Sequence, residues 1–320
     1  MPLSELVQVS VLVPCCNAAE FLADALHSVR NQTFARFECI IVDDASTDSS
    51  AEIAKEFANA DKRFKLIRLS RNEGISAARN TGIAKALGRW IALLDADDLF
   101  MPGRLEELIA IGEAQSADMV VDEQIVTEFP ASYSTSRAFG FSEPAALLTQ
   151  DEFFASRLYR RSLAMGYMKP IMRADFLARI QAAYDPTIHS GEDFLFYADL
   201  FAERPKCIAT ASATYVYRRR RGSLSRSDEH LHFHAALGER VIAKHGDRLS
   251  ERSLASLRKR KREFERLARA IPALNAFRDR NWPRLTRALI SEPSAIGIGL
   301  RLARMHFARW WDARRPAITR

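Results

Sequence analysis

The sequence predicts an α/β protein, with a mostly parallel central sheet flanked by helices and a basic helical extension at the C-terminal end. Short, apolar, β-branched runs alternate with segments of helical periodicity four times over about the first 125 residues, which is typical of a parallel sheet covered by helices. Polar residues follow several of these runs, and open α/β sheets bind ligands at the carboxyl ends of their strands. Basic residues gather in the last part of the chain.

Five apolar runs bounded by turn residues are expected to form strands. They cover residues 7–13, 37–42, 64–69, 90–94 and 119–126. Apolar residues at helical spacing predict helices between them, at residues 18–32, 48–60, 75–87 and 104–114. Ser46 or Thr47 is expected to cap the second of these helices, because a hydroxyl at that place can accept a bond from a backbone N–H of the first turn.

The next part of the chain is less regular. Residues 128–150 contain Pro130, Gly140 and Pro144, and we expect a long loop or a lid there. Periodicity then predicts helices at residues 151–162 and 173–183, another helix that begins near Asp193, a short connector or strand at 166–171, and two short strands within 206–217. From about residue 227 onward the chain is expected to be helical and increasingly basic.

Charge is distributed unevenly along the 320 residues. The whole chain carries a formal net charge of +7, with 47 Lys and Arg against 40 Asp and Glu. Residues 251–320 contain 18 basic and 6 acidic residues, a net of +12, so the rest of the chain has a net of −5. A basic C-terminal region on a mildly acidic body predicts an anionic partner for that region, such as a membrane surface, nucleic acid or a neighbouring subunit.

The four cysteines and the hydropathy pattern point to a cytoplasmic protein. Cys15, Cys16, Cys39 and Cys207 show no C-x-x-C spacing, which argues against a zinc site, and we interpret them as reduced thiols. The first residues lack the basic and then apolar pattern of a secretory signal. We expect no membrane span, because no segment has the 18 or more apolar residues that one requires.

An acidic cluster directly follows the predicted strand at 90–94. Asp95, Asp97 and Asp98 lie within four residues and repel one another, so the sequence predicts a hard divalent cation with oxygen ligands there. The alternative is a solvated acidic turn that caps the helix after Pro102. Two other predicted strands also end in polar residues, and the three ends are expected to converge on one crevice. The first strand is followed by neither a dinucleotide-binding glycine motif nor a P-loop.

Five motifs in order resemble the family 2 inverting glycosyltransferases of the GT-A fold, in their non-processive, bacterial exopolysaccharide and envelope glycan form. The motifs are Val11-Leu12-Val13-Pro14-x-x-Asn17, Gln32-Thr33-Phe34, Val42-Asp43-Asp44-x-Ser46-x-Asp48, Asn72-x-Gly74-x-x-x-Ala78-Arg79-Asn80-x-Gly82 and Leu94-Asp95-x-Asp97-Asp98-x-x-x-Pro102. Gly191-Glu192-Asp193 and Tyr217-Arg218-x-Arg220 extend the resemblance to about residue 225. It implies a Rossmann-like GT-A catalytic domain over residues 1–225, with a nucleotide-binding half at 1–126 and an acceptor half at 127–225, and a helical basic region at 226–320.

The resemblance also implies the reaction: transfer of a hexose from a uridine-diphosphate sugar to a hydroxyl of a glycan acceptor. It implies that this acceptor is a lipid-linked oligosaccharide of polysaccharide biosynthesis. It makes Asp97 the ligand of Mg²⁺ or Mn²⁺, with Asp98 in support, and puts Asp95 near the donor's ribose or sugar. A metal held there bridges the donor phosphates and stabilises the leaving group.

Other residues of the resemblance belong to the donor site. Asp44, or alternatively Asp43, matches the contact with the base, and Pro14, Cys16 and Asn17 lie beside it. Cys16 stands where the family usually has an aromatic side chain. Arg79 matches an arginine near the diphosphate or base; the alternative is a surface residue paired with Glu73. Arg218 and Arg220, in the run 218–221, are interpreted as a diphosphate clamp or, alternatively, as part of a solvated basic loop.

Asp193, with Glu192 beside it, resembles the acidic pair that includes the catalytic base of the family. An inverting transfer needs a base that takes the proton of the acceptor hydroxyl, and a helix N-terminus favours an ionised carboxylate. The alternative is that both residues are simple acids of a first helical turn.

The basic C-terminal region carries the remaining partner predictions. Residues 258–262 are all basic, and apolar and tryptophan-containing stretches follow them. This pattern favours peripheral contact with the cytoplasmic face of the inner membrane. The alternative is a helical subdomain that packs on the catalytic domain or on a second subunit. We expect no nucleic acid partner, and the sequence leaves the oligomeric state open.

Two rival functions remain at the level of sequence. One is a sugar nucleotidyltransferase, but that class has a glycine-rich loop where this chain has Pro14-Cys15-Cys16-Asn17. The other is a non-catalytic relative that binds sugar nucleotides, which the presence of Asp97 and Asp193 argues against.

Overall fold

The computed structural model describes residues 7–128, 135–155, 165–219 and 229–291, together with residues 293 and 297. Contacts divide the chain into two compact units. The first comprises Met1–Arg221 and His245–Ser253, and the second comprises Gly222–Lys244 and Leu254–Arg320. The functional roles predicted for residues 1–225 and 226–320 stay predictions.

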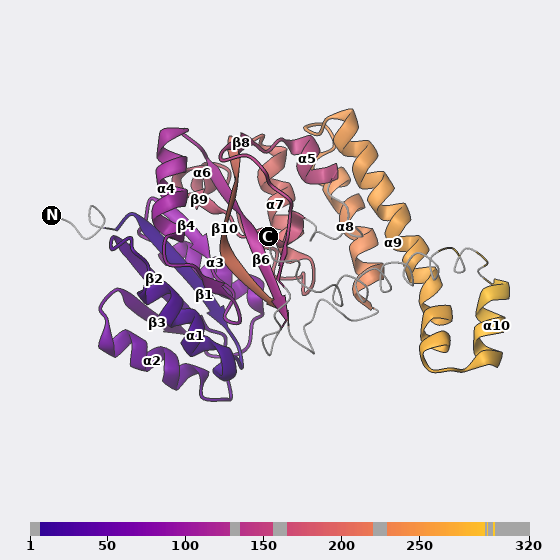
Figure 1. The fold of residues 1–320 in the computed structure, drawn as a ribbon, viewed down its shortest axis with the longest axis horizontal. Coiled ribbons are helices and arrows are strands. Elements are labelled where there is room, and N and C mark those ends of the chain that lie inside the picture. The colour runs from indigo at the N-terminus through magenta and orange to yellow at the C-terminus, as the bar shows by residue number, and fades with distance from the viewer. Residues whose placement is uncertain are drawn as a thin grey trace, which may run out of the picture. The chain divides into compact units, whose positions relative to one another are not determined.

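The first unit contains the sheet, which has ten strands among the described residues (Figure 1). Its spatial order is β3-β2-β1-β4-β9-β6-β10-β5, with β7 and β8 paired to β6 and β10. The first four strands of the chain are parallel, in the order 3-2-1-4, and are β1 (Val9–Cys15), β2 (Phe37–Asp43), β3 (Phe64–Arg68) and β4 (Trp90–Leu93). The helices that connect or follow them are α1 (Ala19–Arg30), α2 (Ser50–Ala60), α3 (Ile75–Lys85) and α4 (Arg104–Ala114).

The second half of the sheet brings distant parts of the chain next to β4. The long strands β6 (Met119–Glu128) and β10 (Cys207–Arg219) are parallel, and β9 (Ile171–Arg173) lies antiparallel between β4 and β6. The shorter strands are β5 (Leu99–Phe100), β7 (Ser136–Arg137) and β8 (Ala146–Leu147), all antiparallel to their partners. The helical elements of this half are α5 (Gln150–Ala155), the 3₁₀ turn η2 (Met165–Tyr167), α6 (Ala174–Arg179) and α7 (Glu192–Ala202).

The side chains of β1, which point alternately to the two faces of the sheet, show that helices cover both faces. Val9, Val11 and Val13 belong to one core cluster together with buried residues of α1, α2 and α4. Leu12 points to the opposite face, as its position in the strand requires. There it meets α3, where a Cβ on Gly82 would lie 3.3 Å from the Leu12 side chain. The predicted α/β fold, with a central sheet flanked by helices, is therefore confirmed.

Several details of the predicted elements are wrong. Residues 206–217 form part of one strand, β10, rather than two, and register shifts between Thr210 and Tyr215 mark an irregularity in it. Helix α6 ends at Arg179, and Gln181 follows with a φ of 52°. The residue before α2 is Ser49, which makes no side-chain capping bond, so neither Ser46 nor Thr47 is the cap. Of the helix predicted at 151–162, residues 156–162 lie outside the described residues.

The second unit contributes most of the helical C-terminal region. Its elements are α8 (Glu229–His245), α9 (Glu251–Arg278) and α10 (Trp282–Ser291), although the last residue of α8 and the first residues of α9 belong to the first unit. Pro272 lies inside α9. Within the described residues, no helix combines the length and the apolar character needed to cross a membrane.

Candidate active site

The loops after β1 and β2 are bonded to one another at the carboxyl ends of these strands. Asn17 adopts a φ of 50°, a left-handed conformation that asparagine tolerates better than most residues. Its side-chain oxygen accepts a bond from the backbone N–H of Thr47 at 2.8 Å, and its own N–H donates to the Ser46 hydroxyl at 3.0 Å. The predicted convergence of these two strand ends is therefore seen in the structure.

Asp44, at the carboxyl end of β2, connects this end of the sheet to the start of α3. Its buried carboxylate accepts bonds from the backbone N–H groups of Glu73 at 2.7 Å and Gly74 at 2.9 Å. Gly74 has a φ of 90°, which favours glycine and allows this turn. Asp43 is also buried, and its carboxylate lies 3.2 Å from Arg68. The predicted contacts of Asp43 and Asp44 with the nucleotide base stay predictions. The structure shows that both carboxylates also bind neighbouring protein groups at the carboxyl ends of the strands.

Pro14 and Cys16 differ in exposure although only one residue separates them. Pro14 is a buried residue of β1, paired in register with Val42. Cys16 is exposed, and its sulfur accepts a bond from the side-chain amide of Asn72 at 3.1 Å. Partial burial, and next the negative charge of Asp44, raise the pKa of the Cys16 thiol. This arrangement leaves Cys16 accessible at the strand ends where a nucleotide is predicted.

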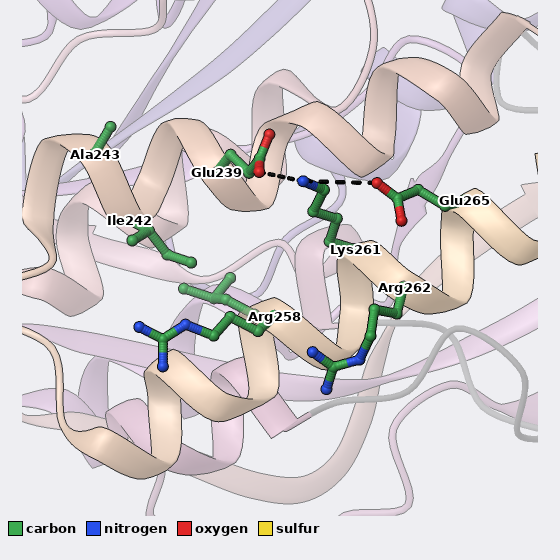
Figure 2. A pocket seen from close by; sticks show the side chains of 8 residues that line it. Glu239, Ile242, Ala243, Arg258, Lys261, Arg262 and Glu265 are labelled. Carbon is green, nitrogen blue, oxygen red and sulfur yellow. Dashed lines mark hydrogen bonds and ion pairs between the residues drawn. The ribbon is translucent and has the colours of Figure 1, made fainter.

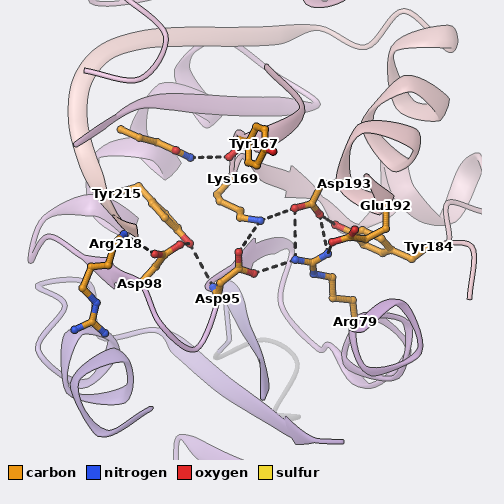
Figure 3. A network of polar contacts seen from close by, with 11 residues as sticks. Arg79, Asp95, Asp98, Tyr167, Lys169, Tyr184, Glu192, Asp193, Tyr215 and Arg218 are labelled. Carbon is orange, nitrogen blue, oxygen red and sulfur yellow. Dashed lines mark hydrogen bonds and ion pairs between the residues drawn. The ribbon is translucent and has the colours of Figure 1, made fainter. Parts of the chain in front are cut away.

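A second cluster connects the acidic turn after β4 with the first turn of α7 (Figure 3). Arg79, buried on α3, lies at its centre. Its guanidinium lies 2.9 Å from Asp95, 2.9 Å from Glu192 and 2.8 Å from Asp193. Glu73 instead pairs with Arg71, so the alternative of a surface Arg79 paired with Glu73 is wrong. Glu192 and Asp193 lie in the first turn of α7, and both also bind this buried cation.

Lys169 is the member of this cluster that the sequence analysis missed. It lies between η2 and β9, is 4% exposed, and places its ammonium 2.9 Å from Asp95 and 2.6 Å from Asp193. Tyr184 donates its hydroxyl to Asp193 at 3.1 Å. The available signal was a single lysine in an apolar stretch: Met168, Pro170 and Ile171 around it are all buried. A lysine in such a stretch needs a carboxylate partner.

Electrostatics keep this cluster charged. Burial raises the pKa of Asp95, but the charges of Lys169 and Arg79 outweigh it and hold that pKa well below its ordinary value. Burial lowers the pKa of Lys169, yet Asp193 and Asp95 outweigh burial and raise it. Burial also lowers the pKa of Arg79, but the nearby acidic groups, Asp193 first, outweigh burial and raise it. Asp95, Glu192 and Asp193 thus place three carboxyl groups around the side chains of Arg79 and Lys169.

The three carboxylates of the acidic turn have different surroundings. Asp98 is fully buried and accepts bonds from the Tyr215 hydroxyl at 2.7 Å and the Arg218 backbone N–H at 2.8 Å. Burial, and next the charge of Asp97, raise the pKa of Asp98. Asp97 is only half-buried. The geometry therefore favours Asp98 as an anchor for β10 rather than as the metal ligand that we predicted, whereas the carboxylate oxygens of Asp97 fit a hard divalent cation.

The acidic turn does not cap the helix after Pro102. Gly103 is the residue before α4, and no side chain makes a capping bond there, so that alternative is wrong. Within the described ranges, no three or more His, Cys, Asp or Glu side chains gather so that they could hold a metal.

Arg218 lies next to the acidic turn, but its contacts are with the protein. It donates from Nε to the Asp97 carbonyl at 2.5 Å, its Nη1 lies 3.1 Å from Asp24, and its guanidinium carbon lies 5.4 Å from the centre of the Phe21 ring. A role in clamping the donor diphosphate stays a prediction. Arg220 lies outside the described residues.

The comparisons with known proteins agree with this architecture. The family model described as "Glycosyl transferase family 2" matches residues 10–167. The succinoglycan biosynthesis protein ExoU of Rhizobium meliloti is 30% identical over 80% of this chain and 75% of its own length. ExoO of the same organism is 37% identical over 68% of this chain, and the alignment covers 62% of ExoO, so the chain spans less than two thirds of that relative.

A solved structure shows the same fold. The crystal structure of S. aureus TarS 1-349 in complex with UDP-GlcNAc superposes with a TM-score of 0.64 and 20% identity, covering 90% of this chain and 81% of that one. Taken with the matched motifs, the sheet topology and the relatives, these findings show that the chain belongs to glycosyltransferase family 2 and has the GT-A fold.

Proposed function

We propose that the protein transfers a hexose from a UDP-sugar to a hydroxyl of a glycan, with inversion, in the synthesis of an extracellular or envelope polysaccharide. Two relatives are named for succinoglycan biosynthesis, and the TarS structure was solved with UDP-GlcNAc, which supports both the pathway class and the donor. A lipid-linked oligosaccharide is the acceptor that we propose. Its hydroxyl oxygen forms a bond to the anomeric carbon while the bond from that carbon to the donor phosphate breaks, and the nucleoside diphosphate leaves with the electron pair.

One observation carries this proposal: Asp193, the proposed base, shares both Arg79 and Lys169 with Asp95 at the strand ends. The donor-side carboxylate and the proposed base are therefore neighbours in space, although β6 and β9 lie between them in the chain. The carboxylate of Asp193 takes the proton of the acceptor hydroxyl. Holding two reactants and a base in one geometry lowers the barrier by removing most of the entropy cost of their encounter.

A divalent cation, Mg²⁺ or Mn²⁺, belongs to this proposal, with Asp97 as the residue that holds it. Bound there, the cation neutralises the negative charge that builds on the departing diphosphate. Because Asp98 uses both of its oxygens within the protein, Asp97 is the side chain of the turn that fits this role.

The experiment that tests the function is turnover of a panel of nucleotide sugars, with and without Mn²⁺ or Mg²⁺, by the wild type and by Asp193→Asn. We expect release of nucleoside diphosphate from one donor, and a loss of about 10²- to 10⁴-fold in Asp193→Asn with unchanged donor binding. Asp61→Asn, which removes a surface partner of Arg63, is the matched control. Retained turnover in Asp193→Asn would contradict the assignment of the base.

The same assay, run also with nucleoside triphosphates and sugar phosphates in place of the nucleotide sugars, separates the rival functions. A sugar nucleotidyltransferase joins a nucleoside triphosphate to a sugar phosphate and releases pyrophosphate, whereas a binding module releases nothing from any donor. Formation of pyrophosphate, or binding of a donor with no turnover under all metal conditions, would therefore replace the glycosyltransferase proposal.

We also propose that the second unit contacts the cytoplasmic face of the inner membrane. Large apolar side chains are exposed there: Phe277 at 63%, Trp282 at 59% and Ile290 at 79%. A groove between α8 and α9 is lined by Arg258 and Arg262, both exposed, while Lys261 binds Glu239 and Glu265 (Figure 2). Exposed arginines and exposed apolar side chains within one unit favour contact with an anionic lipid surface.

Flotation with vesicles tests this second proposal. We expect the wild type to float with vesicles that contain anionic lipid and not with neutral ones, and Arg258→Glu with Arg262→Glu to weaken flotation. Lys244→Glu with Lys62→Glu, at two exposed lysines outside the groove, gives the same change in net charge and is the control. Equal flotation of wild type and the double variant would reject the role of the groove, and no flotation of the wild type would reject membrane contact altogether.

A further inference from the structure

Lys169 is a buried cation to which neither the sequence motifs nor the relatives assign a role. Its ammonium contacts one oxygen of Asp95 and one oxygen of Asp193, and Arg79 contacts the other oxygen of each. The two carboxylates and the two cations thus form a closed ring of ion pairs (Figure 3). Lys169 closes this ring between the donor-side carboxylate and the proposed base.

The position of Lys169 is fixed by the backbone on which it lies. Its carbonyl accepts a bond from Arg104 at 2.5 Å. Arg104 is itself fully buried and forms a two-bond ion pair with the buried carboxylate of Asp122, at 3.0 and 2.9 Å. Two parallel bonds of this kind hold the guanidinium in one orientation. The start of the lysine side chain is therefore anchored to the core of the sheet.

The contacts of Asp193 show what the lysine does. A carboxylate offers about four lone-pair positions for hydrogen bonds. Arg79 and Tyr184 occupy two positions on Oδ1, at 2.8 and 3.1 Å, and Lys169 occupies one on Oδ2 at 2.6 Å. Among the described residues, only Arg79 contacts the fourth position, at a long distance of 3.5 Å. That fourth position is where an acceptor hydroxyl can bind at the least cost.

Removal of the lysine charge changes this balance. Asp95, Glu192 and Asp193 then share Arg79 as their only cation in the ring, and the repulsion between Asp95 and Asp193 is no longer screened by a charge between them. The carboxylate of Asp193 loses the bond that fixes Oδ2 and is free to rotate away from the acceptor. A shift of about 1 Å in such a group can cost on the order of 10²-fold in rate.

We propose that Lys169 is a positioning residue for sugar transfer: it fixes the orientation of Asp193 and its spacing from Asp95, so that base and donor are aligned. The inference rests on the proposed function, because it assumes that Asp193 is the base. Lys169 acts through Asp193 and does not itself exchange the proton.

The experiment compares Lys169→Met, Lys169→Arg, Asp193→Asn and the double variant Lys169→Met with Asp193→Asn in the full chain. Thermal midpoint, nucleotide binding, donor KM and kcat for transfer are measured for each. We expect Lys169→Met to lower kcat by about 10²-fold and to change donor KM by less than about threefold, because the loss lies in alignment. Lys169→Arg keeps the charge, and we expect it to recover part of kcat.

The double variant distinguishes positioning from a general loss of structure. If Lys169 acts through Asp193, Lys169→Met lowers kcat no further once Asp193→Asn is present, since the base that it orients is gone. Lys65→Met is the matched control, because Lys65 also pairs with a buried carboxylate, Glu38, at 2.7 Å. We expect the control to leave kcat and donor KM unchanged.

Each outcome decides between the two assignments. Full kcat in Lys169→Met, together with an inactive Asp193→Asn, overturns the role of Lys169 and leaves the proposed function standing. An active Asp193→Asn overturns the proposed base, and with it this inference. If Lys169→Met does not fold, Lys169→Arg is the deciding variant. A rise in its donor KM as large as its fall in kcat overturns the positioning role. So does a loss of kcat that adds to the loss caused by Asp193→Asn when the two changes are combined.

Discussion

The guanidinium of Arg79 lies 2.8 Å from the carboxylate of Asp193, although 114 residues separate them in the chain. Arg79 belongs to α3, within residues 1–126, and Asp193 lies in the first turn of α7. The cation also binds Asp95 at the end of β4. One buried residue thus connects the donor motif with the proposed base, so a change at Arg79 is expected to affect stability and activity together.

Arg79→Met tests that connection. We expect a loss of about 3–5 kcal/mol in the free energy of unfolding, because removal of the buried arginine leaves three partly buried carboxylates with a single cation, Lys169. Urea unfolding followed by circular dichroism measures it. Arg71→Met is the control, since Arg71 is 81% exposed and pairs with Glu73 on the surface; its expected change is within about 0.5 kcal/mol. A small loss in Arg79→Met would mean that the cluster is not held by this arginine.

Asp97→Asn and Asp98→Asn should give opposite results although the two residues are adjacent. Asp97 is half-buried and is the proposed ligand, so we expect Asp97→Asn to weaken Mn²⁺ binding in the presence of UDP by more than tenfold, on the order of 1.4 kcal/mol, with little change in unfolding. Asp98 accepts bonds from Tyr215 and the Arg218 backbone, so Asp98→Asn should lower stability by about 1–3 kcal/mol. Calorimetric titration and urea unfolding measure the two effects. Loss of metal binding in Asp98→Asn with stability intact would restore Asp98 as a ligand.

How far the sequence predicts this molecule depends on whether a signal is local. Strand β4 and the acidic turn after it can be predicted because the apolar run and the carboxylates are contiguous. The boundaries of α4 were predicted to the residue, since Pro102 and Gly103 precede it and its apolar residues repeat at helical spacing. Local periodicity fails at residues 206–217, because pairing with all of β6 makes β10 one strand in spite of its irregularity.

The candidate site was predicted less completely, because the signals are in tertiary contacts. The motifs indicated Asp95, Arg79 and Asp193 one by one, but nothing in the spacing shows that they meet around one lysine. Whether Asp98 points to solvent or to Tyr215, 117 residues away, cannot be inferred from a run of three carboxylates. Partners that come from distant strands decide which acidic residue is available, and a single sequence does not contain that information.

The pH dependence of stability should show the ion pairs of Asp95. Lys169 and Arg79 lower the pKa of Asp95 from its ordinary value of 3.8. A carboxyl whose pKa is depressed in the folded state stabilises the protein above its unfolded pKa, and this contribution is lost as the pH falls through the folded value. We therefore expect the stability difference between wild type and Asp95→Asn to be constant from pH 7 to about 5 and to shrink at lower pH.

Urea midpoints at pH 7, 5, 4 and 3 measure this difference. Asp247→Asn, at an exposed position, serves as the control and should show no such trend. A difference between wild type and Asp95→Asn that grows as the pH falls would contradict the depressed pKa of Asp95.

Thiol labelling should report directly on the nucleotide site. Cys15, Cys39 and Cys207 are buried, and burial raises the pKa of Cys15 to about 12, so these thiols should resist alkylation at pH 8. Cys16 is exposed beside Asp44 and Asn72, and we expect it to react with iodoacetamide, more slowly than a free thiol because its pKa is raised. Mass spectrometry of peptides gives the modified position and the rate. If a nucleotide binds at the ends of β1 and β2, saturating UDP with Mn²⁺ should slow the labelling of Cys16 at least about tenfold, and ribose 5-phosphate should not. Labelling of Cys16 at an equal rate with and without UDP, under conditions where UDP binding is measured independently, would place the uracil base of the nucleotide elsewhere.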